Sequence, residues 1–210
     1  MLEPIRHLLD NFHIILASSS PRRSELLTNL GLKFDVIPSH FEEDLDPKSF
    51  PNYGNFAAET AHQKVLDISR RIPPDVSRPQ LIVGADTIVT LDGKMFGKPK
   101  NQDEAFNYLS ELNNRTHTVY TGVALKSAEL EMKFHTCANV SMAKLSEEVI
   151  KAYINTGEPM DKAGAYGIQG IGATLIEKID GCYFTVMGLP LHETSKHIIK
   201  LCEEIKTKQL

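Results

Sequence analysis

One segment near the start of the chain combines hydroxyl groups with two arginines in a setting that suits an anionic ligand. Residues 18–23 read SSSPRR and directly follow the apolar run His13–Ala17. Where a buried strand leads at once into a helix, free backbone N–H groups and the positive end of the helix dipole face an incoming anion. Guanidinium groups bind phosphate oxygens through paired hydrogen bonds. An ordinary capped helix with solvated arginines would show the same local pattern.

Asp86 is the second candidate, because it follows Leu81–Ala85, a strand otherwise too apolar to tolerate an unpaired charge. A metal ion, a lysine or a polarised water would each satisfy this carboxylate, and the first and third are used in phosphoryl chemistry. A turn-forming aspartate satisfied by local backbone is the alternative. The hairpin signal Asp92-Gly93 separates Asp86 from Lys98, so the returning strand would bring the Lys98 ammonium beside Asp86. The other interpretation of Lys98 is a solvated surface lysine.

An acidic run, Glu42-Glu43-Asp44, follows a predicted strand and offers carboxylate oxygens to a hard divalent cation. Most acidic runs are merely solvated surface. Glu43 is therefore a candidate metal ligand only if the fold brings it close to Asp86.

Residues 161–170 read DKAGAYGIQG, and their three spaced glycines would let the backbone pass close to a ligand. Such glycines also have purely conformational causes. Gln169 adds a side-chain amide whose acceptor and donors match the N3–H group and flanking carbonyls of a uracil or thymine ring. A buried polar match of this kind discriminates strongly between bases, since a wrong base leaves polar groups unpaired.

The elements that must position these residues alternate between strand and helix. Period-2 and continuous apolar runs predict strands, and apolar residues at helical spacing with capping residues predict helices. The expected strands are His13–Ala17, Phe34–Ile37, Leu81–Ala85 continued by Ile88–Leu91, the long pair 116–125 and 133–143, and two strands, 173–179 and 183–187, around Asp180-Gly181. The expected helices run from the Ser20 cap to Gly31, over 54–70, from an Asp103 cap through Leu112, over 146–154, and from Pro190 through Ile205. The pattern predicts an elongated mixed α/β sheet flanked by helices, with two lobes.

Composition limits the function further. The 210 residues are 41% hydrophobic and 24% charged with a net charge of −4, which fits a folded globular protein and lacks the basic surplus of non-specific nucleic-acid binders. With no tryptophan and 7% aromatic residues, a stacking platform for single strands is also missing. No apolar run has signal-peptide or membrane-span length, so we expect an intracellular, cytoplasmic protein without a membrane partner.

Other sequence signals are weak or absent. The three cysteines are far apart and match neither a disulfide framework nor a CxxC metal pair, so we expect buried reduced thiols. The commonest nucleotide-binding and zinc motifs, GxxxxGK[ST], GxGxxG and HExxH, are missing. We interpret His62, His117 and His135 as surface or packing residues. The proline-rich stretch 71–79 is expected to form a surface loop.

Taken in order, five segments resemble the Maf family of nucleoside triphosphate pyrophosphatases, and most closely its dTTP/UTP pyrophosphatase branch. They are LASSSPRR at 16–23, GADT at 84–87, KP at 98–99, YTGV at 120–123 and DKAGAYGIQG at 161–170. The likeness runs from about residue 14 to about residue 199.

The resemblance implies an α/β fold related to inosine triphosphate pyrophosphatase, with two lobes around a deep cleft. It implies a single catalytic domain over 14–205 after an N-terminal extension, 1–13, and usually a homodimer. The implied reaction hydrolyses a nucleoside triphosphate to the monophosphate and pyrophosphate with a divalent metal cation, Mg²⁺, Mn²⁺ or Co²⁺.

Residue roles carried over from the family are as follows. Asp86 matches the proton acceptor, and Lys98 is the second catalytic residue. The positions that select the base are Arg22, Thr87 and Gln169. Positions that hold phosphates are Ser18, Arg23, Lys64 and Lys162; Glu43 and Asp86 match the metal site, and Asp161 is a further cleft position. We expect Asp86 to orient and deprotonate a water that attacks the α-phosphorus while pyrophosphate leaves.

Two alternatives remain open. One is a 7-methyl-GTP-type pyrophosphatase of the same family, against which Arg22 and Gln169 argue, because a large purine is expected to want an aromatic stacking partner. The other is a non-catalytic nucleotide-binding regulator of cell division. Asp86 together with Lys98 favours catalysis, since a pure binder gains nothing from a carboxylate facing phosphates.

Overall fold

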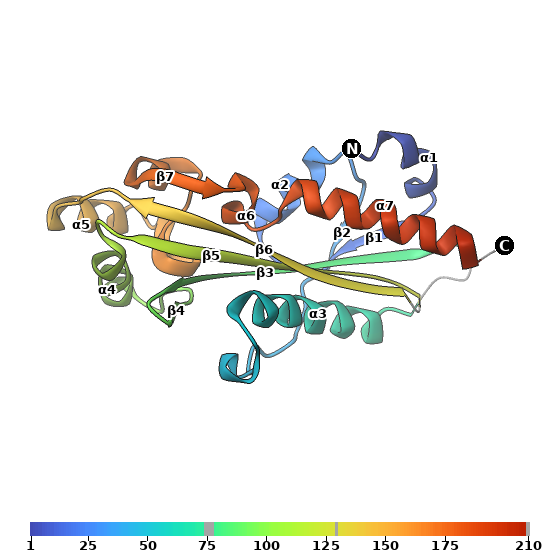
Figure 1. Cartoon of the computed structure of the whole chain (residues 1–210), viewed down its shortest axis with the longest axis horizontal. Coiled ribbons are helices and arrows are strands. Elements are labelled where there is room, and N and C mark those ends of the chain that lie inside the picture. The colour runs from blue at the N-terminus through green and yellow to red at the C-terminus, as the bar shows by residue number, and fades with distance from the viewer. Residues whose placement is uncertain (74–77, 129, 209–210) are drawn as a thin grey trace. The chain divides into compact units, whose positions relative to one another are not determined.

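Three long strands form the middle of a seven-stranded sheet in the computed structural model, which describes residues 1–73, 78–128 and 130–208. They are β3 (Gln80–Leu91), β5 (Thr116–Ser127) and β6 (Leu130–Met142). The strand order is β2-β1-β3-β5-β6-β7, and β4 pairs with β3 beside this path (Figure 1). Because β1 pairs in parallel with β2 and β3 whereas β4 and β7 pair antiparallel, the sheet is mixed, which confirms the predicted fold class.

The chain forms two compact units, and each long strand contributes to both. Unit 1 contains Met1–Asp86, Thr121–His135 and Gly188–Leu210, and unit 2 contains Thr87–Tyr120 and Thr136–Met187. The remaining strands are β1 (His13–Leu16) and β2 (Asp35–Val36) in unit 1, and β4 (Lys94–Phe96) and β7 (Ile176–Gly181) in unit 2. The helices of unit 1 are α1 (Arg6–Leu9), α2 (Pro21–Asn29), α3 (Tyr53–Arg71) and α7 (Leu191–Lys208), and those of unit 2 are α4 (Gln102–Leu112), α5 (Glu147–Asn155) and α6 (Tyr183–Met187). Short 3₁₀ helices cover Glu3–Ile5, Pro47–Ser49, Glu158–Asp161, Ala163–Ala165 and Gly170–Leu175.

In unit 1, α3 lies unusually close to the sheet. A Cβ atom added to Gly84 of β3 would lie 2.6 Å from the carbonyl oxygen of Ala61, and one added to Gly122 of β5 would lie 2.2 Å from the backbone of Ala57. Any larger residue at these two positions would force the helix away from the strands. The apolar face of α3 fills the space with fully buried Ala61, Val65 and Ile68. Figure 1 shows α3 on one face of the sheet and α2 and α7 on the other.

In unit 2, a separate core packs around α4 and the parts of the long strands that belong to this unit, 87–91 of β3, 116–120 of β5 and 136–142 of β6. Its largest fully buried side chains include Phe96, Leu109, Leu112 and Met142. Helix α4 packs against α5 and against the turn Ala163–Ala165. The hairpin between β3 and β4 turns at Asp92 and Gly93, both with positive φ, as the sequence predicts.

Most predicted elements are confirmed, including α2 beginning at Pro21, α3, α5 behind its Ser146 cap, and α7. The prediction for residues 183–187 was wrong, because they form the helix α6 rather than a strand. A five-residue apolar run does not distinguish a strand from a buried helical turn. Residues 173–175 also differ, since they belong to a 3₁₀ turn and the strand begins only at Ile176.

Smaller corrections concern single residues. Helix α4 is capped by Asn101, whose side-chain oxygen accepts a hydrogen bond from the Glu104 N–H, and not by Asp103. Ser20 occupies the N-cap position of α2 without a side-chain capping bond.

The three cysteines differ in their exposure to solvent. All three cysteines are free, but only Cys202 is buried; Cys182 is half-buried and Cys137 is exposed, so the expectation of three buried thiols was wrong. Residues 74–77 of the predicted loop lie outside the described residues. Among the helices that the structure describes, none is long and apolar enough to cross a membrane.

Candidate active site

The start of α2 in unit 1 holds the first group of candidate residues. Ser18 follows β1 and is 7% exposed, and its hydroxyl oxygen accepts hydrogen bonds from the Ser20 N–H at 3.3 Å and from Nη1 of Arg23 at 3.0 Å. Nε of Arg23 donates to the Gly188 carbonyl oxygen at 3.0 Å. Contacts on two sides therefore fix the guanidinium of Arg23 at the N-terminal end of α2.

The electrostatic surroundings of Arg23 show which charges lie near it. Burial lowers the pKa of Arg23, while the Asp86 and Glu43 carboxylates raise it and Arg22 lowers it. An arginine remains protonated across the physiological range even when its pKa falls somewhat. A permanent positive charge thus stands close to the two acidic candidates.

Lys64 joins the two acidic candidates directly. Its Nζ atom lies 2.7 Å from Oδ1 of Asp86 and 2.7 Å from Oε1 of Glu43. The Lys64 and Asp86 side chains are 12% and 11% exposed, whereas that of Glu43 is 56% exposed. Ser18, Arg23, Glu43, Lys64 and Asp86 therefore gather in one region of unit 1.

The close approach of α3 explains this contact. Gly84 and Asp86 project from the same face of β3, because side chains alternate along a strand. Ala61 lies against Gly84, and Lys64 comes about one helical turn after Ala61 on the same side of α3. The missing side chain at Gly84 thus brings the Lys64 ammonium within reach of Asp86.

This contact identifies one partner of Asp86 among those that the sequence left open. A lysine satisfies the carboxylate, and it is Lys64, which the family resemblance had placed among the phosphate ligands. Asp86 lies inside β3, which continues past Asp86-Thr87 to Leu91 as the sequence predicts. The alternative of a local backbone turn is therefore excluded. Thr87 follows inside the same strand, so its side chain projects to the opposite face from Asp86.

The chemistry of the two carboxylates fits a divalent metal ion. Glu43 and Asp86 already share one cation, the Lys64 ammonium. Mg²⁺ typically binds to one or two carboxylates and takes its other ligands from water and substrate phosphates. Within the described ranges, no group of three or more His, Cys, Asp or Glu side chains is gathered as a metal site. The Glu43 and Asp86 carboxylates, together with oxygen ligands from a phosphorylated substrate, therefore form a ligand set that suits Mg²⁺.

Unit 2 holds a second group of candidate residues. Nζ of Lys162 donates to the Glu158 carbonyl oxygen at 2.6 Å and pairs with Oδ1 of Asp161 at 2.6 Å. The Gly164 N–H donates to the carbonyl oxygen of Gly97 at 3.1 Å, so the backbone next to Lys98 is joined to the glycine-rich segment. Gln169 is half-buried between Ile168 and Gly170 in this segment. Lys98 and the segment 161–170 are therefore neighbours within unit 2.

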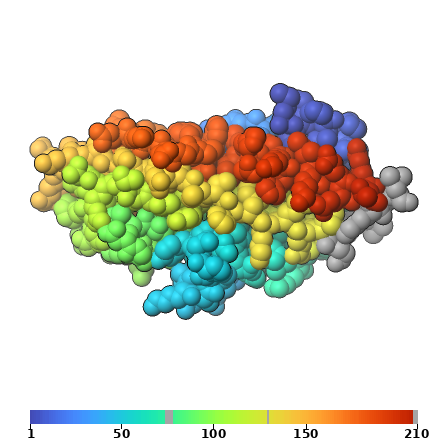
Figure 2. Space-filling model, in the orientation of Figure 1, coloured from blue at the N-terminus to red at the C-terminus, as the bar shows by residue number. Residues whose placement is uncertain are grey.

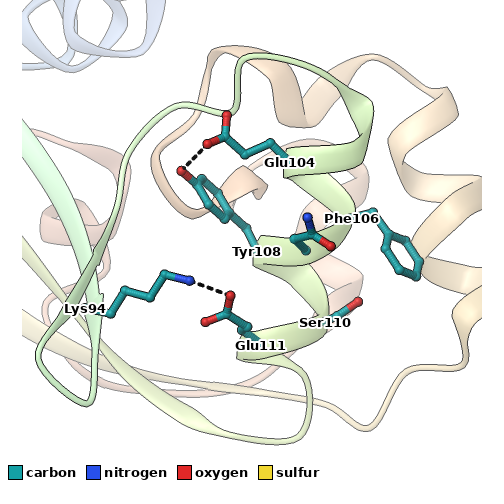
Figure 3. A pocket seen from close by; sticks show the side chains of 7 residues that line it. Lys94, Glu104, Phe106, Tyr108, Ser110 and Glu111 are labelled. Atoms are coloured by element: carbon teal, nitrogen blue, oxygen red, sulfur yellow. Dashed lines mark hydrogen bonds and ion pairs between the residues drawn. The ribbon is translucent and has the colours of Figure 1, made fainter.

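A surface hollow on unit 2 is distinct from these groups. It has a volume of about 560 Å³ and is lined by Lys94 and by side chains of α4 (Figure 3). Lys94 pairs with Glu111 at 2.5 Å, and the Tyr108 hydroxyl donates to Glu104 at 2.9 Å. None of the candidate residues lines it, and the charged groups that do are engaged with one another. The hollow therefore offers no catalytic arrangement.

His117 is buried in unit 2, where it contacts the glycine-rich segment. It is a packing residue, 2% exposed, as one of the two interpretations predicts. However, its Nε2 atom also lies 2.7 Å from the hydroxyl of Tyr166, which belongs to the glycine-rich segment. Burial lowers the pKa of His117 to about 4, so this imidazole is neutral at pH 7. No spacing in the sequence connects these two residues, which are 49 positions apart.

The chain is similar in sequence to several known proteins. A family model described as Maf-like protein matches residues 13–201. A dTTP/UTP pyrophosphatase of Caldicellulosiruptor saccharolyticus is 40% identical over 94% of this chain and 98% of its own length. One from Aquifex aeolicus is 43% identical over 90% of this chain and 95% of its own. A human protein named probable bifunctional dTTP/UTP pyrophosphatase/methyltransferase protein is 42% identical over 96% of this chain, but the chain spans only 34% of that protein's length.

Proposed function

Because the chain belongs to the Maf family, we propose that it is a nucleoside triphosphate pyrophosphatase that hydrolyses dTTP and UTP to the monophosphate and pyrophosphate. Two bacterial relatives that carry the name dTTP/UTP pyrophosphatase align with this chain over nearly their whole lengths. The methyltransferase named in the human relative is not part of the proposal, since most of that protein lies outside the aligned region.

One observation carries the proposal, namely the contact of Lys64 with both Asp86 and Glu43 beside Arg23. A triphosphate brings about four negative charges to a protein whose net charge is already −4, so it must be neutralised locally. Arg23 and Lys64 supply positive charge, and the Ser18 hydroxyl can donate to a phosphate oxygen. In unit 2, Lys98 and Lys162 take the same role in the proposal.

Asp86 is the general base in the proposed reaction. Its carboxylate holds an attacking water and accepts the proton as the water oxygen bonds to the α-phosphorus and the bond to the pyrophosphate oxygen breaks. The Lys64 ammonium donates a hydrogen bond to Oδ1 of Asp86 at 2.7 Å and so fixes the position of the carboxylate. A divalent ion, Mg²⁺, Mn²⁺ or Co²⁺, held by Glu43 and Asp86 would stabilise negative charge on the phosphate oxygens.

In the proposal, Arg22, Thr87 and Gln169 select the base. Asp161, which pairs with Lys162, is a further residue of the substrate site. The amide of Gln169 matches the donor and acceptor pattern of uracil and thymine. The proposal also includes a homodimer, a cytoplasmic location and no nucleic-acid partner, in keeping with the acidic net charge.

A product assay tests the function. The purified chain is incubated with Mg²⁺, Mn²⁺ or Co²⁺ and each of dTTP, UTP, CTP and 7-methyl-GTP, and the products are identified by phosphorus NMR. We expect monophosphate and pyrophosphate from dTTP and UTP at the highest rates. Release of inorganic phosphate instead, or tight nucleotide binding without turnover, would contradict the proposal. Preferred hydrolysis of 7-methyl-GTP would move the chain to the alternative branch.

A further inference from the structure

The carboxylate of Glu158 lies against the segment that carries Gln169, and it is not among the residues assigned above. Its Oε2 atom accepts a hydrogen bond from the Ile171 N–H at 3.0 Å, and its Oε1 atom accepts one from the Gly172 N–H at 2.9 Å. Glu158 is half-buried at the start of a short 3₁₀ helix in unit 2. One side chain therefore holds two successive backbone donors directly after Gln169 and Gly170.

Tyr153 extends this contact to the other side of Gln169. Its hydroxyl donates to Oε1 of Glu158 at 3.0 Å and accepts from the Gly167 N–H at 3.1 Å. Tyr153 is 3% exposed, and burial raises the pKa of its hydroxyl, so the group stays protonated and able to donate. Glu158 and Tyr153 together bind backbone N–H groups both before and after Gln169.

The glycines of the segment show that its backbone is shaped around these two side chains. A Cβ atom added to Gly172 would lie 2.5 Å from the Tyr153 hydroxyl and 2.9 Å from Oε1 of Glu158. Gly170 has φ +70° and a Cβ there would lie 2.8 Å from Oε2 of Glu158. A Cβ at Gly172 would also lie 2.3 Å from the Gly167 carbonyl oxygen, and the positive φ of Gly170 itself favours glycine.

We propose that Glu158 is a positioning residue that sets the conformation of residues 167–172 and thereby orients the Gln169 amide toward the base. This inference rests on the proposed function, in which Gln169 recognises uracil or thymine. Lys162 is held by the backbone carbonyl of Glu158 and not by its carboxylate. A change confined to the Glu158 side chain therefore disturbs base recognition while leaving the anchor of Lys162 in place.

Glutamine is the informative substitution because it has the shape of glutamate and the wrong hydrogen-bonding pattern. Both carboxylate oxygens of Glu158 only accept, and they face three donors. In Glu158→Gln, an NH₂ group must face at least one of these N–H or O–H donors, which leaves donors unpaired. Aspartate keeps the acceptors but lacks the reach, so Glu158→Asp serves as a second variant.

The experiment measures kcat and KM for UTP, dTTP and CTP, together with amide hydrogen exchange of residues 167–172. In Glu158→Gln we expect the preference for UTP over CTP, as the ratio of kcat/KM values, to fall by about tenfold, mainly through a higher KM for UTP. The exchange of the Gly167, Ile171 and Gly172 amides should rise in the same variant. Tyr153→Phe should shift both readouts in the same direction, and the double variant should add little, because the residues act as one unit.

Glu177→Gln is the matched control, since Glu177 is an exposed glutamate on β7 shortly after the segment. It should change neither the base preference nor the exchange. An unchanged UTP/CTP ratio in Glu158→Gln, or an equal loss of kcat/KM for all three nucleotides, would overturn the inference. Failure of the proposed function is distinguishable, because it appears as absent triphosphate turnover in the unmodified protein, and the specificity role of Glu158 then falls with it.

Discussion

The Lys64 ammonium lies 2.7 Å from a carboxylate oxygen of Asp86, and each of the two side chains is close to nine-tenths buried. A pair of this kind is costly to bury, because each charge loses its hydration. The arrangement is maintained by the approach of α3 to Gly84 of β3. A buried charge pair beside Arg23 is typical of functional sites, where charged groups are kept at the expense of stability.

Asp86→Asn tests the catalytic role of this carboxylate. The amide preserves the size of the side chain but cannot accept a proton from water, so we expect kcat to fall by about 100-fold or more, as is typical when a general base is removed. Binding of a non-hydrolysable dTTP analogue, measured by calorimetry, should stay within a few-fold of the unmodified protein. Asp92→Asn, at the exposed β3–β4 hairpin, is the control and should retain full turnover. Near-normal turnover in Asp86→Asn would remove Asp86 from the mechanism.

Glu43→Gln tests the metal assignment with two neighbouring controls. Replacement of one of two metal-binding carboxylates weakens the attraction for a hard cation, so the Mg²⁺ concentration that gives half-maximal rate should rise by about tenfold or more. Glu42→Gln and Asp44→Asn change exposed carboxylates of the same loop and should leave the Mg²⁺ dependence unchanged. If all three variants respond alike, the loop acts only through its summed charge and Glu43 is not a specific ligand.

The sequence predicted α2 and β1 well because their signals are local, with Pro21 at the first helical position and Gly31 at φ +71° after the last. It also predicted that Asp86 needs a partner. It could not identify Lys64 as that partner, because the contact depends on how closely α3 packs on the sheet. The available signal was the small residues Ala57 and Ala61 on α3, which match the two strand glycines that they contact.

Glu158 was missed for a related reason. Its role depends on hydrogen bonds to backbone N–H groups, and these donors are present at almost every residue and leave no mark in the sequence. The indirect signal was the pair Gly170 and Gly172, where an added Cβ atom would lie 2.8 Å and 2.9 Å from the Glu158 carboxylate oxygens. Residues 183–187 were misassigned because local apolarity alone was used to choose between strand and helix.

His117 predicts a pH dependence of stability. Its folded pKa of about 4 lies below the value near 6.5 that an unfolded histidine has. The unfolded chain therefore binds a proton between pH 6.5 and pH 4 that the folded chain does not. The contribution of His117 to the free energy of unfolding is thus fully present above pH 6.5 and is lost as the pH is lowered toward 4. From pH 7 to pH 5 this one group should lower the unfolding free energy by about 2 kcal/mol.

The measurement is urea unfolding at both pH values. His117→Gln keeps a polar group facing Tyr166 but does not titrate, so its loss of stability between pH 7 and pH 5 should be smaller by that amount. His135→Gln changes an exposed histidine on β6 and should show the same pH dependence as the unmodified chain. Equal pH dependence in all three proteins would show that His117 does not carry this effect.

Arg6 predicts a structural role for the N-terminal residues. Its Nη1 and Nη2 atoms donate to the carbonyl oxygens of Gly31 at 2.5 Å and Leu30 at 3.0 Å, and Nη2 also pairs with Glu3. The last carbonyls of a helix have no partner within the helix, so this guanidinium caps the C-terminal end of α2. The N-terminal segment lies on the surface in Figure 2, in blue beside the red α7, and is anchored there by buried Leu2 and Leu9.

Arg6→Ala should therefore lower the free energy of unfolding by about 1–2 kcal/mol, the usual effect of losing hydrogen bonds from a charged donor. Arg6→Lys should recover only part of this loss, because a single ammonium does not reproduce the planar fork that reaches both carbonyls. Arg70→Ala, at an exposed position of α3, is the control. The KM for dTTP should not change in Arg6→Ala, since the capped end of α2 is opposite the end that carries Arg22 and Arg23, and fraying is confined to the last turn. A rise in KM with unchanged stability would instead place the N-terminal segment in substrate binding.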